Sequence, residues 1–364
     1  MCVTGRGALQ AMAMAAMTKT VLAVRNGHLE IFQSETSFMP AVSEKCRRSA
    51  SRRRDSARLS ARIENHLRVR ICVIFNPAAR GNKARRFKKF LSELSQQCAL
   101  KATTGPGDAR RFAQAAVATG YDVIAAAGGD GTVNEVLNGI GDEPDGFAKT
   151  RLGVLPLGTV NVFARELKIP LKLEHAWKVL KRARETKIDL GRADFLDDGK
   201  SQSRYFMQLG GAGLDARAIE LVSWKLKKTA GPIAYVVAGF QALAERQPQI
   251  TVSANGQKIA GELALFGNGK FYGGSFHIFP EAHLSNGCLD ICVFPKVNVP
   301  TLLRLAPSFL LRQKLSEHRV CRLRAEKFEM TSDLPAAFEL DGEWAGNLPA
   351  TFSVERQKLR VVVP

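Results

Sequence analysis

Apolar residues in the first half of the chain come in short runs that alternate with segments of helical pattern. A strand-like segment from Ala99 breaks at "GPG" (105–107), after which Asp108 is a candidate N-cap and Gly120 a candidate C-terminal stop for a helix. Strands that alternate with helices predict a parallel sheet covered on both faces, with ligands outside the carboxyl ends of its strands. The other strand-like runs are "VRICVIF" (69–75), "YDVIAAA" (121–127) and "RLGVLPL" (151–157).

The second half of the chain has the pattern of antiparallel β structure. The segment "QITVSANGQKIAGELALF" (249–266) reads as a hairpin with Asn255-Gly256 at its turn. Further strand candidates are "RYFMQL" (204–209), "HRVCRLRAEKFEM" (318–330) and "KLRVVV" (358–363).

A glycine-rich loop stands where the run at 121–127 meets a helical segment. In "GGDGTVNE" (128–135), Thr132 and Glu135 match a T-x-x-E capping box, which would begin the helix at the loop and point its free amides into it. The glycines fit a tight strand-to-helix turn, or a backbone that a phosphate can approach at the positive end of the helix. Asp130 favours the phosphate site, because a turn needs no acid there, whereas a nucleotide site uses a carboxylate to organise magnesium or hydrogen bonds.

Two other phosphate-binding signatures are disfavoured. The chain has no G-x-x-x-x-G-K-[ST] motif, which excludes a P-loop enzyme. The segment "GAGLDA" (211–216) matches G-x-G-x-x-A, but no acid follows about 20 residues later, as a dinucleotide fold requires. A dehydrogenase is therefore not the preferred interpretation.

Composition adds size and charge to this picture. The 364 residues are 45% apolar, which suits a folded protein of two domains, and 53 Lys and Arg against 34 Asp and Glu give a net charge of +19. Such an excess favours phosphates, nucleic acid or an anionic membrane surface as partners. The segment from Lys45 to Arg70 contains ten basic residues and only two acids, and it lacks a sustained apolar face. Residues 1–66 are predicted to be a basic, mostly disordered extension or a misassigned start.

Targeting and redox signals point to the cytoplasm. A transit peptide is disfavoured for the extension because it contains Glu30, Glu35, Glu44 and Asp55. No apolar run reaches the roughly 18 residues that a spanning helix needs. The seven cysteines include no C-x-x-C pair, which fits a reducing compartment.

Seven motifs occur in an order that resembles the bacterial diacylglycerol kinase family of lipid kinases, from about residue 69 to the C-terminus. The resemblance implies an α/β nucleotide-binding domain with a mostly parallel sheet over residues 67–195 and a mainly antiparallel β domain over 196–364. It places the active site in the cleft between the domains and lets the last residues return to the first domain. The motifs are "FNPAARG" (75–81), "GGDGTVNEVLNGI" (128–140), "GVLPLGTVNVFARELKIP" (153–170), "DLG" (189–191), "GAGLDA" (211–216), "GPIAYVVAGF" (231–240) and "LDGEWAG" (340–346).

The resemblance also assigns residues to ATP and magnesium. Asp130, Asn161 and Asp189 match a polar network around magnesium and the phosphates, and Glu343 lies on the nucleotide side. The residues placed against ATP are loop or helix-start positions that follow predicted strands: Asn76, Pro77, Ala78, Ala79, Arg80, Thr103, Gly129, Asp130, Gly131, Thr132, Val133, Asn134, Glu135 and Thr159.

The general base implied by the resemblance is Asp341 of "LDGEWAG". A lipid hydroxyl is a poor nucleophile, so a carboxylate that accepts its proton suits the chemistry. From the residues alone, Asp341-Gly342 fits a solvated hairpin turn equally well.

Two positions depart from the family pattern. Val162 stands where the family commonly has an aspartate, which removes one acid near the phosphates. Asn286 stands in place of the aspartate that binds a structural magnesium, and a neutral oxygen attracts a hard cation less strongly.

These observations predict an ATP- and magnesium-dependent kinase acting on diacylglycerol or a related lipid at the inner face of a membrane. The segments "ELVSWKLKK" (220–228), with Trp224, and "TLLRLAPSFLLRQKL" (301–315) are candidates for peripheral membrane contact or ordinary amphipathic helices. The alternatives are an NAD kinase-like enzyme that phosphorylates a soluble dinucleotide and a basic nucleic-acid-binding protein. No recognised nucleic-acid-binding motif supports the latter. The oligomeric state, a homodimer included, is left open.

Overall fold

In the computed structural model the chain divides into two units, Met1–Arg68 and Val69–Pro364. The first unit contributes β1 (Val24–Arg25), which pairs antiparallel with β2 (His28–Leu29), and the rest of the predicted extension lies outside the described residues. The structure describes the backbone of these two strands and residues 69–78, 90, 94–214, 216–217, 247–272, 276–298 and 320–364.

The first part of the second unit is an α/β structure. Its strands pair in the order β4-β3-β5-β6, all parallel, which confirms the predicted sheet. Every residue of β3 and β5 is buried, as expected for strands covered on both faces. The elements, in chain order, are β3 (Ile71–Phe75), β4 (Ala99–Ala102), α4 (Asp108–Thr119), β5 (Val123–Gly128), α5 (Asp130–Gly141), α6 (Gly146–Lys149), β6 (Arg151–Pro156), α7 (Val162–Glu166) and α8 (Leu173–Arg182).

The bounds of α4 differ by one residue from the prediction at one end and agree at the other. Gly107, with φ of 83°, is the N-cap, and Asp108 is the first helical residue, so the predicted N-cap is wrong. The Asp108 carboxylate instead accepts hydrogen bonds from the amides of Thr104 and Gly105. Gly120, with φ of 81°, ends the helix as predicted. None of the described helices is long and apolar enough to cross a membrane.

The second part consists of antiparallel strands. Asn255 and Gly256, both with positive φ, join β10 to β11, which confirms the predicted hairpin. The first half of "GAGLDA" (211–213) lies in β9, between the antiparallel neighbours β12 and β18, so it is not the turn of a dinucleotide fold. The strands are β7 (Glu185–Asp197), β8 (Lys200–Phe206), β9 (Leu209–Gly213), β10 (Ile250–Ala254), β11 (Gln257–Gly261), β12 (Leu263–Gly267), β13 (Phe271–Tyr272), β14 (Phe276–His277), β15 (Leu289–Phe294), β16 (Cys321–Ala325), β17 (Lys327–Ser332), β18 (Ala337–Leu340), β19 (Glu343–Asn347) and β20 (Ala350–Val362).

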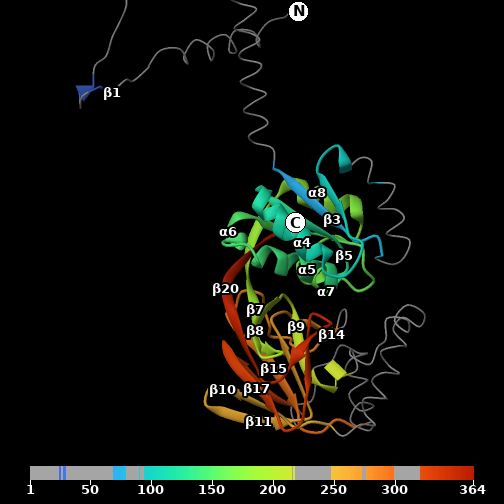
Figure 1. The fold of residues 1–364 in the computed structure, drawn as a ribbon, viewed down its shortest axis with the longest axis vertical. Coiled ribbons are helices and arrows are strands. Elements are labelled where there is room, and N and C mark those ends of the chain that lie inside the picture. The colour runs from blue at the N-terminus through green and yellow to red at the C-terminus, as the bar shows by residue number, and fades with distance from the viewer. Residues whose placement is uncertain are drawn as a thin grey trace, which may run out of the picture. The chain divides into compact units, whose positions relative to one another are not determined.

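Strand β20 joins the two parts into one ten-stranded sheet, and its path from the antiparallel strands toward the helices is visible in Figure 1. Its first half pairs antiparallel with β17, and it pairs with β7 on both sides of an irregularity between Glu355 and Leu359. Near its end, Val361 pairs in parallel with Leu152 of β6. The parallel sheet therefore continues directly into the antiparallel one.

Aromatic side chains fill the space between the two sheets of the antiparallel part. The second sheet has the order β16-β15-β12-β9-β18-β19. Phe266 of this sheet packs against Phe206, Phe328 and Phe352 of the ten-stranded sheet, with ring centroids 4.5–5.4 Å apart. Phe338 of β18 meets Phe352 edge-on at 5.4 Å. This buried layer fixes β18, and with it the hairpin that follows, on the ten-stranded sheet.

Helices α4 and α5 approach closely at Gly139. A Cβ added there would lie 2.1 Å from the carbonyl oxygen of Arg110 and 2.9 Å from the Cβ of Ala113. A backbone carbonyl of a neighbouring helix cannot rotate away as the end of a side chain can. Gly139 is therefore required by packing between the helices.

We expect Gly139→Ala to lower the free energy of unfolding by about 1–3 kcal/mol, measured by urea denaturation. The clash outweighs the roughly 0.5–1 kcal/mol that alanine gains over glycine inside a helix. Gly105→Ala is the control, because no atom lies within 4 Å of its added Cβ. Equal stability of the Gly139→Ala variant and the parent would contradict the packing argument.

Candidate active site

The loops that follow the parallel strands are joined at one edge of the sheet by backbone hydrogen bonds. The amide of Asn76, after β3, donates to the penultimate carbonyl of β5 (3.0 Å), and the amide of Thr103, after β4, donates to the last carbonyl of β3 (2.8 Å). The amide of Leu157, after β6, donates to the Gly128 carbonyl (2.9 Å). Four predicted phosphate loops therefore begin side by side.

The side chain of Asn76 stabilises the loop after β3 with two hydrogen bonds. Its Oδ1 accepts a hydrogen bond from the amide of Ala78 (2.9 Å), and its Nδ2 donates to Oγ1 of Thr132 in α5 (3.2 Å). Pro77 and Ala78 are exposed, and so is Thr159, which follows β6. The predicted contacts of Ala79 and Arg80 concern positions beyond the described part of this loop.

The glycines of the β5–α5 loop allow close approaches within the protein. A Cβ added at Gly128 would lie 2.3 Å from Oγ1 of Thr132, so the loop closes onto the first turn of its own helix. A Cβ added at Gly158 would lie 2.5 Å from the Cα of Gly129, so the loops after β5 and β6 touch backbone to backbone. Local packing alone is sufficient to require glycine at Gly128 and Gly158.

Helix α5 begins three residues earlier than the predicted capping box implies. Gly129 is its N-cap and Asp130 its first residue, so Thr132 already lies in the first turn and the capping box is wrong. Glu135 reaches a neighbouring helix instead, where its Oε2 accepts a hydrogen bond from the amide of Ala109 in α4 (3.0 Å). Val133 is buried in the core. The helix still presents its N-terminus at the glycine loop, as a phosphate site requires.

The Asp130 carboxylate faces the first turn of α7. Its Oδ1 accepts a hydrogen bond from the amide of Phe163 (3.2 Å). Burial raises the pKa of Asp130, and hydrogen bonds from the amides of Val162 and Phe163 oppose the rise. Asn161 is buried and donates from Nδ2 to the Gly158 carbonyl (2.7 Å). Asp130 thus places a carboxylate at the start of α7, next to the apolar and buried side chain of Val162.

Asp341 and Gly342 form the turn between β18 and β19, with φ of 51° and 85°. Three successive amides, of residues 207–209 where β8 leads into β9, surround the Asp341 carboxylate, a concave arrangement that suits an anion. Burial raises the pKa of Asp341, and these donors oppose the rise. A residue that only shaped a solvated turn would need no such donors. The donors are the amides of Gln208 (2.9 Å) and Leu209 (3.2 Å) to Oδ1, and the amide of Met207 (2.9 Å) and Nδ2 of Asn134 (2.8 Å) to Oδ2.

The hairpin also brings Glu343 to the start of α5. A Cβ added at Gly131 would lie 2.3 Å from Oε1 of Glu343, so the carboxylate rests against the loop backbone. Arg204 of β8 is half-buried near this carboxylate and donates from Nη1 to the Trp344 carbonyl (3.2 Å). Burial lowers the pKa of Arg204, and the negative charges of Glu343 and Asp341 oppose the decrease. The site therefore contains both acids and a cation.

Asp189 of β7 is buried, with a relative exposure of 1%. Its two carboxylate oxygens accept hydrogen bonds from the amides of Gly287 and Gln357, both at 2.7 Å. Asn268 donates from Nδ2 to the carbonyls of Asp189 and Met207, both at 2.9 Å. Asp189 therefore connects β20 with the 284–287 loop. Through Asn268 it also connects them with residues 207–209, whose amides bind the Asp341 carboxylate.

The predicted metal ligand Asn286 is exposed, and its Oδ1 accepts a hydrogen bond from the amide of Cys288 (3.2 Å). The guanidinium of Arg356 lies over the next residue, because a Cβ added at Gly287 would be 2.6 Å from its Cζ. Among the residues that the structure describes, no group of three or more His, Cys, Asp or Glu could hold a metal ion. The carboxamide oxygen of Asn286 is thus already paired within its own turn.

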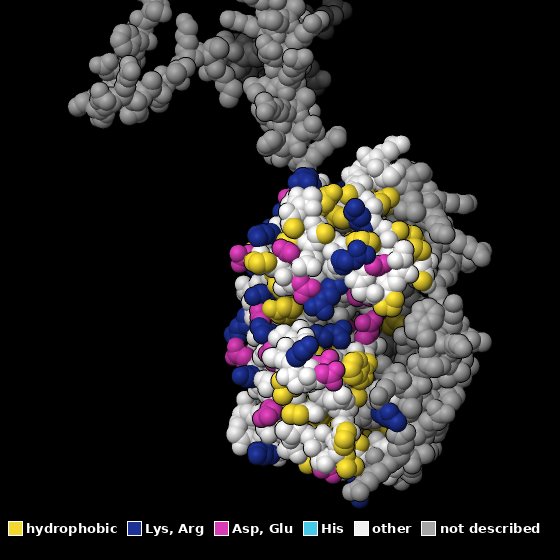
Figure 2. Space-filling view, in the orientation of Figure 1, with side chains coloured by type: hydrophobic (Ala, Val, Ile, Leu, Met, Phe, Trp, Pro, Cys, Tyr) yellow, Lys and Arg dark blue, Asp and Glu magenta, His cyan; other side chains and the backbone are white. Residues whose placement is uncertain are grey.

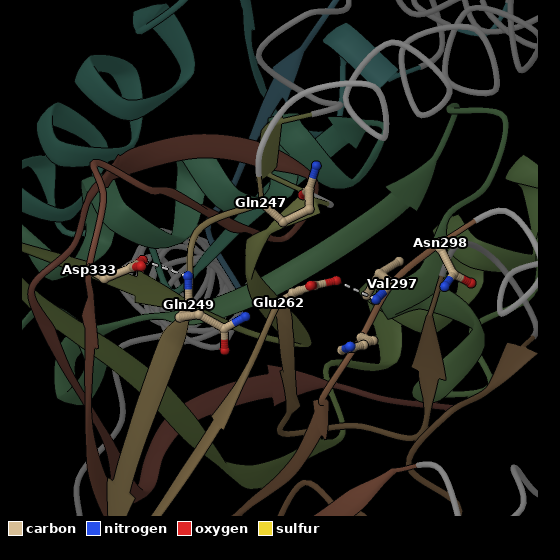
Figure 3. A pocket seen from close by; sticks show the side chains of 7 residues that line it. Gln247, Gln249, Glu262, Val297, Asn298 and Asp333 are labelled. Atoms are coloured by element: carbon tan, nitrogen blue, oxygen red, sulfur yellow. Dashed lines mark hydrogen bonds between the residues drawn. The ribbon is translucent and has the colours of Figure 1, made fainter.

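Figure 3 shows a separate hollow of about 440 Å³. Glu262 in its wall precedes the end of β12 that pairs with Gly213 of β9, whereas Asp341 binds Leu209 at the opposite end of β9. Two carboxylates in its wall already bind backbone: Glu262 accepts from the amide of Val297, and Asp333 accepts from the amide of Gln249, both at 2.6 Å. The predicted site residues lie elsewhere. This hollow is therefore not the candidate active site.

Sequence reasoning missed several residues that build the site. Asn138, Gln208, Asn268 and Arg204 all contact or face the residues around Asp341. One signal was available for Asn138, because an amide four residues after Asn134 shares its helix face, which otherwise carries apolar residues. Trp224 and the segment 301–315, predicted to contact a membrane, lie outside the described residues.

Comparisons with known proteins agree with this architecture. The family model "Diacylglycerol kinase catalytic domain" matches residues 70–193, and "YegS C-terminal NAD kinase beta sandwich-like domain" matches residues 210–363. A crystal structure of a diacylglycerol kinase from Bacillus anthracis shares the fold, with a TM-score of 0.60 at 19% identity over 81% of this chain and 97% of that chain.

Two curated relatives match most of the chain. The diacylglycerol kinase of Bacillus subtilis is 32% identical over 302 residues, which are 80% of this chain and 95% of the relative. That of Staphylococcus aureus (strain MRSA252) is 30% identical over 305 residues, which are 82% of this chain and 93% of the relative. The resemblance seen in the motifs is thereby confirmed, and the chain belongs to the diacylglycerol kinase family.

Proposed function

We propose that this protein is a lipid kinase that transfers the γ-phosphoryl group of ATP to a hydroxyl of diacylglycerol or a related lipid. The observation that carries the proposal is the 2.8 Å hydrogen bond between Asn134 and Asp341. Asn134 lies in the helix that begins at the glycine loop, and Asp341 is the acid of the β18–β19 turn. A phosphate loop and a proton acceptor are thus held next to each other.

The start of α5 supports the binding of the ATP phosphates. The helix dipole favours negative charge at this end, and the loops after β3, β4 and β6 meet it at the same edge of the sheet. Backbone amides and short polar side chains such as Asn76 and Thr132 suit phosphate oxygens. Kinase family membership makes ATP the expected phosphate donor.

Asp341 is proposed as the general base. As the lipid hydroxyl oxygen forms its bond to the γ-phosphorus, the hydroxyl proton passes to Asp341, and the bond to the leaving ADP oxygen breaks. Burial raises the pKa of this carboxyl, which makes it a better proton acceptor than a solvated aspartate. Arg204 contributes positive charge beside the two acids of the hairpin.

Magnesium fits this site as a partner of the nucleotide rather than as an ion in a protein cage. Mg²⁺ is commonly held by one or two carboxylates together with substrate phosphates. Asp130, the first residue of α5, is a carboxylate at this N-terminus and belongs to the network that the family resemblance assigns to magnesium. The ion would neutralise phosphate charge there. The structural magnesium expected at Asn286 is not part of the proposal.

Membrane contact and a cytoplasmic location remain part of the proposal. Diacylglycerol resides in a bilayer, so an enzyme acting on it must approach the membrane surface. The net charge of +19 would favour an anionic surface. Nucleic acid is a weaker candidate, because the face in Figure 2 carries Asp and Glu side chains among the Lys and Arg rather than a purely basic surface.

The second candidate function is phosphorylation of a soluble dinucleotide. It is favoured by the name of the family model for residues 210–363, which describes an NAD kinase-like sandwich. We expect label from γ-³²P-ATP to appear on diacylglycerol in mixed vesicles and not on NAD, measured by chromatography of both reactions. Label on NAD with none on any lipid would reject the lipid kinase.

Replacement of the proposed base should separate chemistry from nucleotide binding. Asp341→Asn keeps the shape of the side chain and loses the proton acceptor. We expect phosphoryl transfer to fall about a hundredfold or more, while ATP affinity measured by calorimetry stays close to the parental value. Glu329→Gln in β17 is the control, because this exposed acid lies outside the site. Transfer at the parental rate in Asp341→Asn would show that the base is another residue.

The contact between Gly131 and Glu343 allows a test by double substitution. A methyl group at residue 131 would displace the Glu343 carboxylate, which is the mobile end of a side chain. We expect Gly131→Ala and Glu343→Ala each to reduce ATP turnover, and the double variant to be no worse than Glu343→Ala. Losses that multiply in the double variant would instead indicate that the methyl group obstructs the nucleotide itself.

A further inference from the structure

Two amide side chains lie on the buried face of α5, one turn apart. Asn134 and Asn138 have relative exposures of 2% and 4%. Their buried neighbours on the helix include Val133, Val136 and Leu137. A buried amide costs free energy unless its donors and acceptor are paired, so the partners of these two residues explain why polar groups stand there.

Asn138 pairs with the backbone of one residue in β8. Its Oδ1 accepts a hydrogen bond from the amide of Tyr205 (2.9 Å), and its Nδ2 donates to the carbonyl of the same residue (3.0 Å). The side-chain amide thereby bonds to both backbone groups of Tyr205, as an adjacent strand would. This contact docks the middle of α5 onto the edge of β8.

The orientation of Asn134 agrees with that of Asn138. The Tyr205 amide can only donate, so the oxygen of Asn138 faces this amide and its Nδ2 lies on the other side, toward the Tyr205 carbonyl. That Nδ2 donates to Oδ1 of Asn134 (3.1 Å), so the Nδ2 of Asn134 must face the other way. It donates to Oδ2 of Asp341 at 2.8 Å, with a longer contact of 3.4 Å to the Tyr205 carbonyl.

We propose that Asn134 is a positioning residue, which stabilises the negative charge on Oδ2 of Asp341 from helix α5 and orients that oxygen for proton transfer. This inference rests on the proposed role of Asp341 as the base. The other three donors to the carboxylate are backbone amides of residues 207–209, in the antiparallel part. Asn134 is the donor that comes from the helix of the glycine loop. It therefore ties the orientation of the base to the position of that helix.

Several charged groups lie near Asp341 and influence its pKa. They must stay the same when a variant is compared with the parent. Arg204 approaches from β8 and Glu343 from β19, while Glu339 of β18 accepts a hydrogen bond from the amide of Gly342 (2.7 Å). Glu166 of α7 binds the side chain of Gln208 (2.9 Å). Burial raises the pKa of Asp341, and the hydrogen bond from Asn134 is one of the contacts that lower it. Loss of this donor should therefore raise the pKa further.

The test is a direct titration of Asp341 in the full chain. The carboxyl pKa is measured by NMR of ¹³C-labelled aspartate, and Asp341→Asn identifies the resonance. Asn134→Leu should raise the pKa by about one unit or more, the scale of a hydrogen bond to a charged group. Asn134→Ala removes the same donor with a smaller side chain and should raise the pKa in the same direction, so it provides the same test if the leucine variant does not fold.

Asn138→Leu is the matched control on the same helix face. It removes the contact with Tyr205 and should lower the free energy of unfolding. It leaves the donor to Asp341 in place, because the ionised carboxylate can only accept and therefore keeps the Nδ2 of Asn134 toward it. Its Asp341 pKa should stay near the parental value. An unchanged pKa in the Asn134 variants, or an equal shift in Asn138→Leu, would overturn the proposal, since the second result would assign the effect to loosened docking of α5.

Kinetics provide a separate readout. The acid limb of the kcat/KM profile should move to higher pH in Asn134→Leu, with kcat reduced. The NMR titration needs no substrate. If no lipid accepts phosphate, the proposed function fails while the titration still decides whether Asn134 controls Asp341.

Discussion

The pairing of strand β20 with both parts of the chain is the constraint on which the site depends. Its antiparallel bonds to β7 and β17 and its parallel pairing with β6 make the two parts a single sheet. Since the aromatic layer fixes β18 on that sheet, the hairpin with Asp341 and Glu343 is held at a set distance from α5. Rigid positioning of this kind is what proton transfer and phosphoryl transfer require.

Local features of the site and fold could be predicted from the sequence. The parallel strands, the end of α4 at Gly120 and the Asn255-Gly256 hairpin each follow from patterns within a few residues. The capping box failed because Gly129 already begins the helix, and because Glu135 finds its partner in α4. A motif three residues apart gives no information on a competing partner 26 positions away.

The surroundings of Asp341 could not be predicted for the same reason. The family resemblance singled out this residue, but its donors come from positions 132 to 207 residues away in the chain. Arg204 belongs to none of the seven motifs, and Asn138 lies inside "GGDGTVNEVLNGI" without an assigned role. Their functions depend on which backbone groups the fold brings opposite them, as with Tyr205 and Trp344.

Burying acids at this site opposes stability, and the fold compensates with backbone amides. Asp341 has three amide donors, and Asp189 has two. A carboxylate without such partners would be strongly destabilising in the interior. A backbone amide does not depend on the identity of its side chain. Substitution of Met207 or Gly287 therefore keeps these donors as long as the backbone at that residue keeps its path.

The position of β20 in the chain also has a consequence for biosynthesis. Its Val361 pairs with Leu152, 209 positions earlier, so β6 leaves the ribosome long before its partner is made. During that interval the nascent parallel sheet has an open edge, where unpaired backbone groups can recruit foreign strands. Completion of the nucleotide-binding half is thus delayed until the antiparallel half has been translated. Cotranslational folding of this enzyme therefore cannot proceed simply one domain after the other.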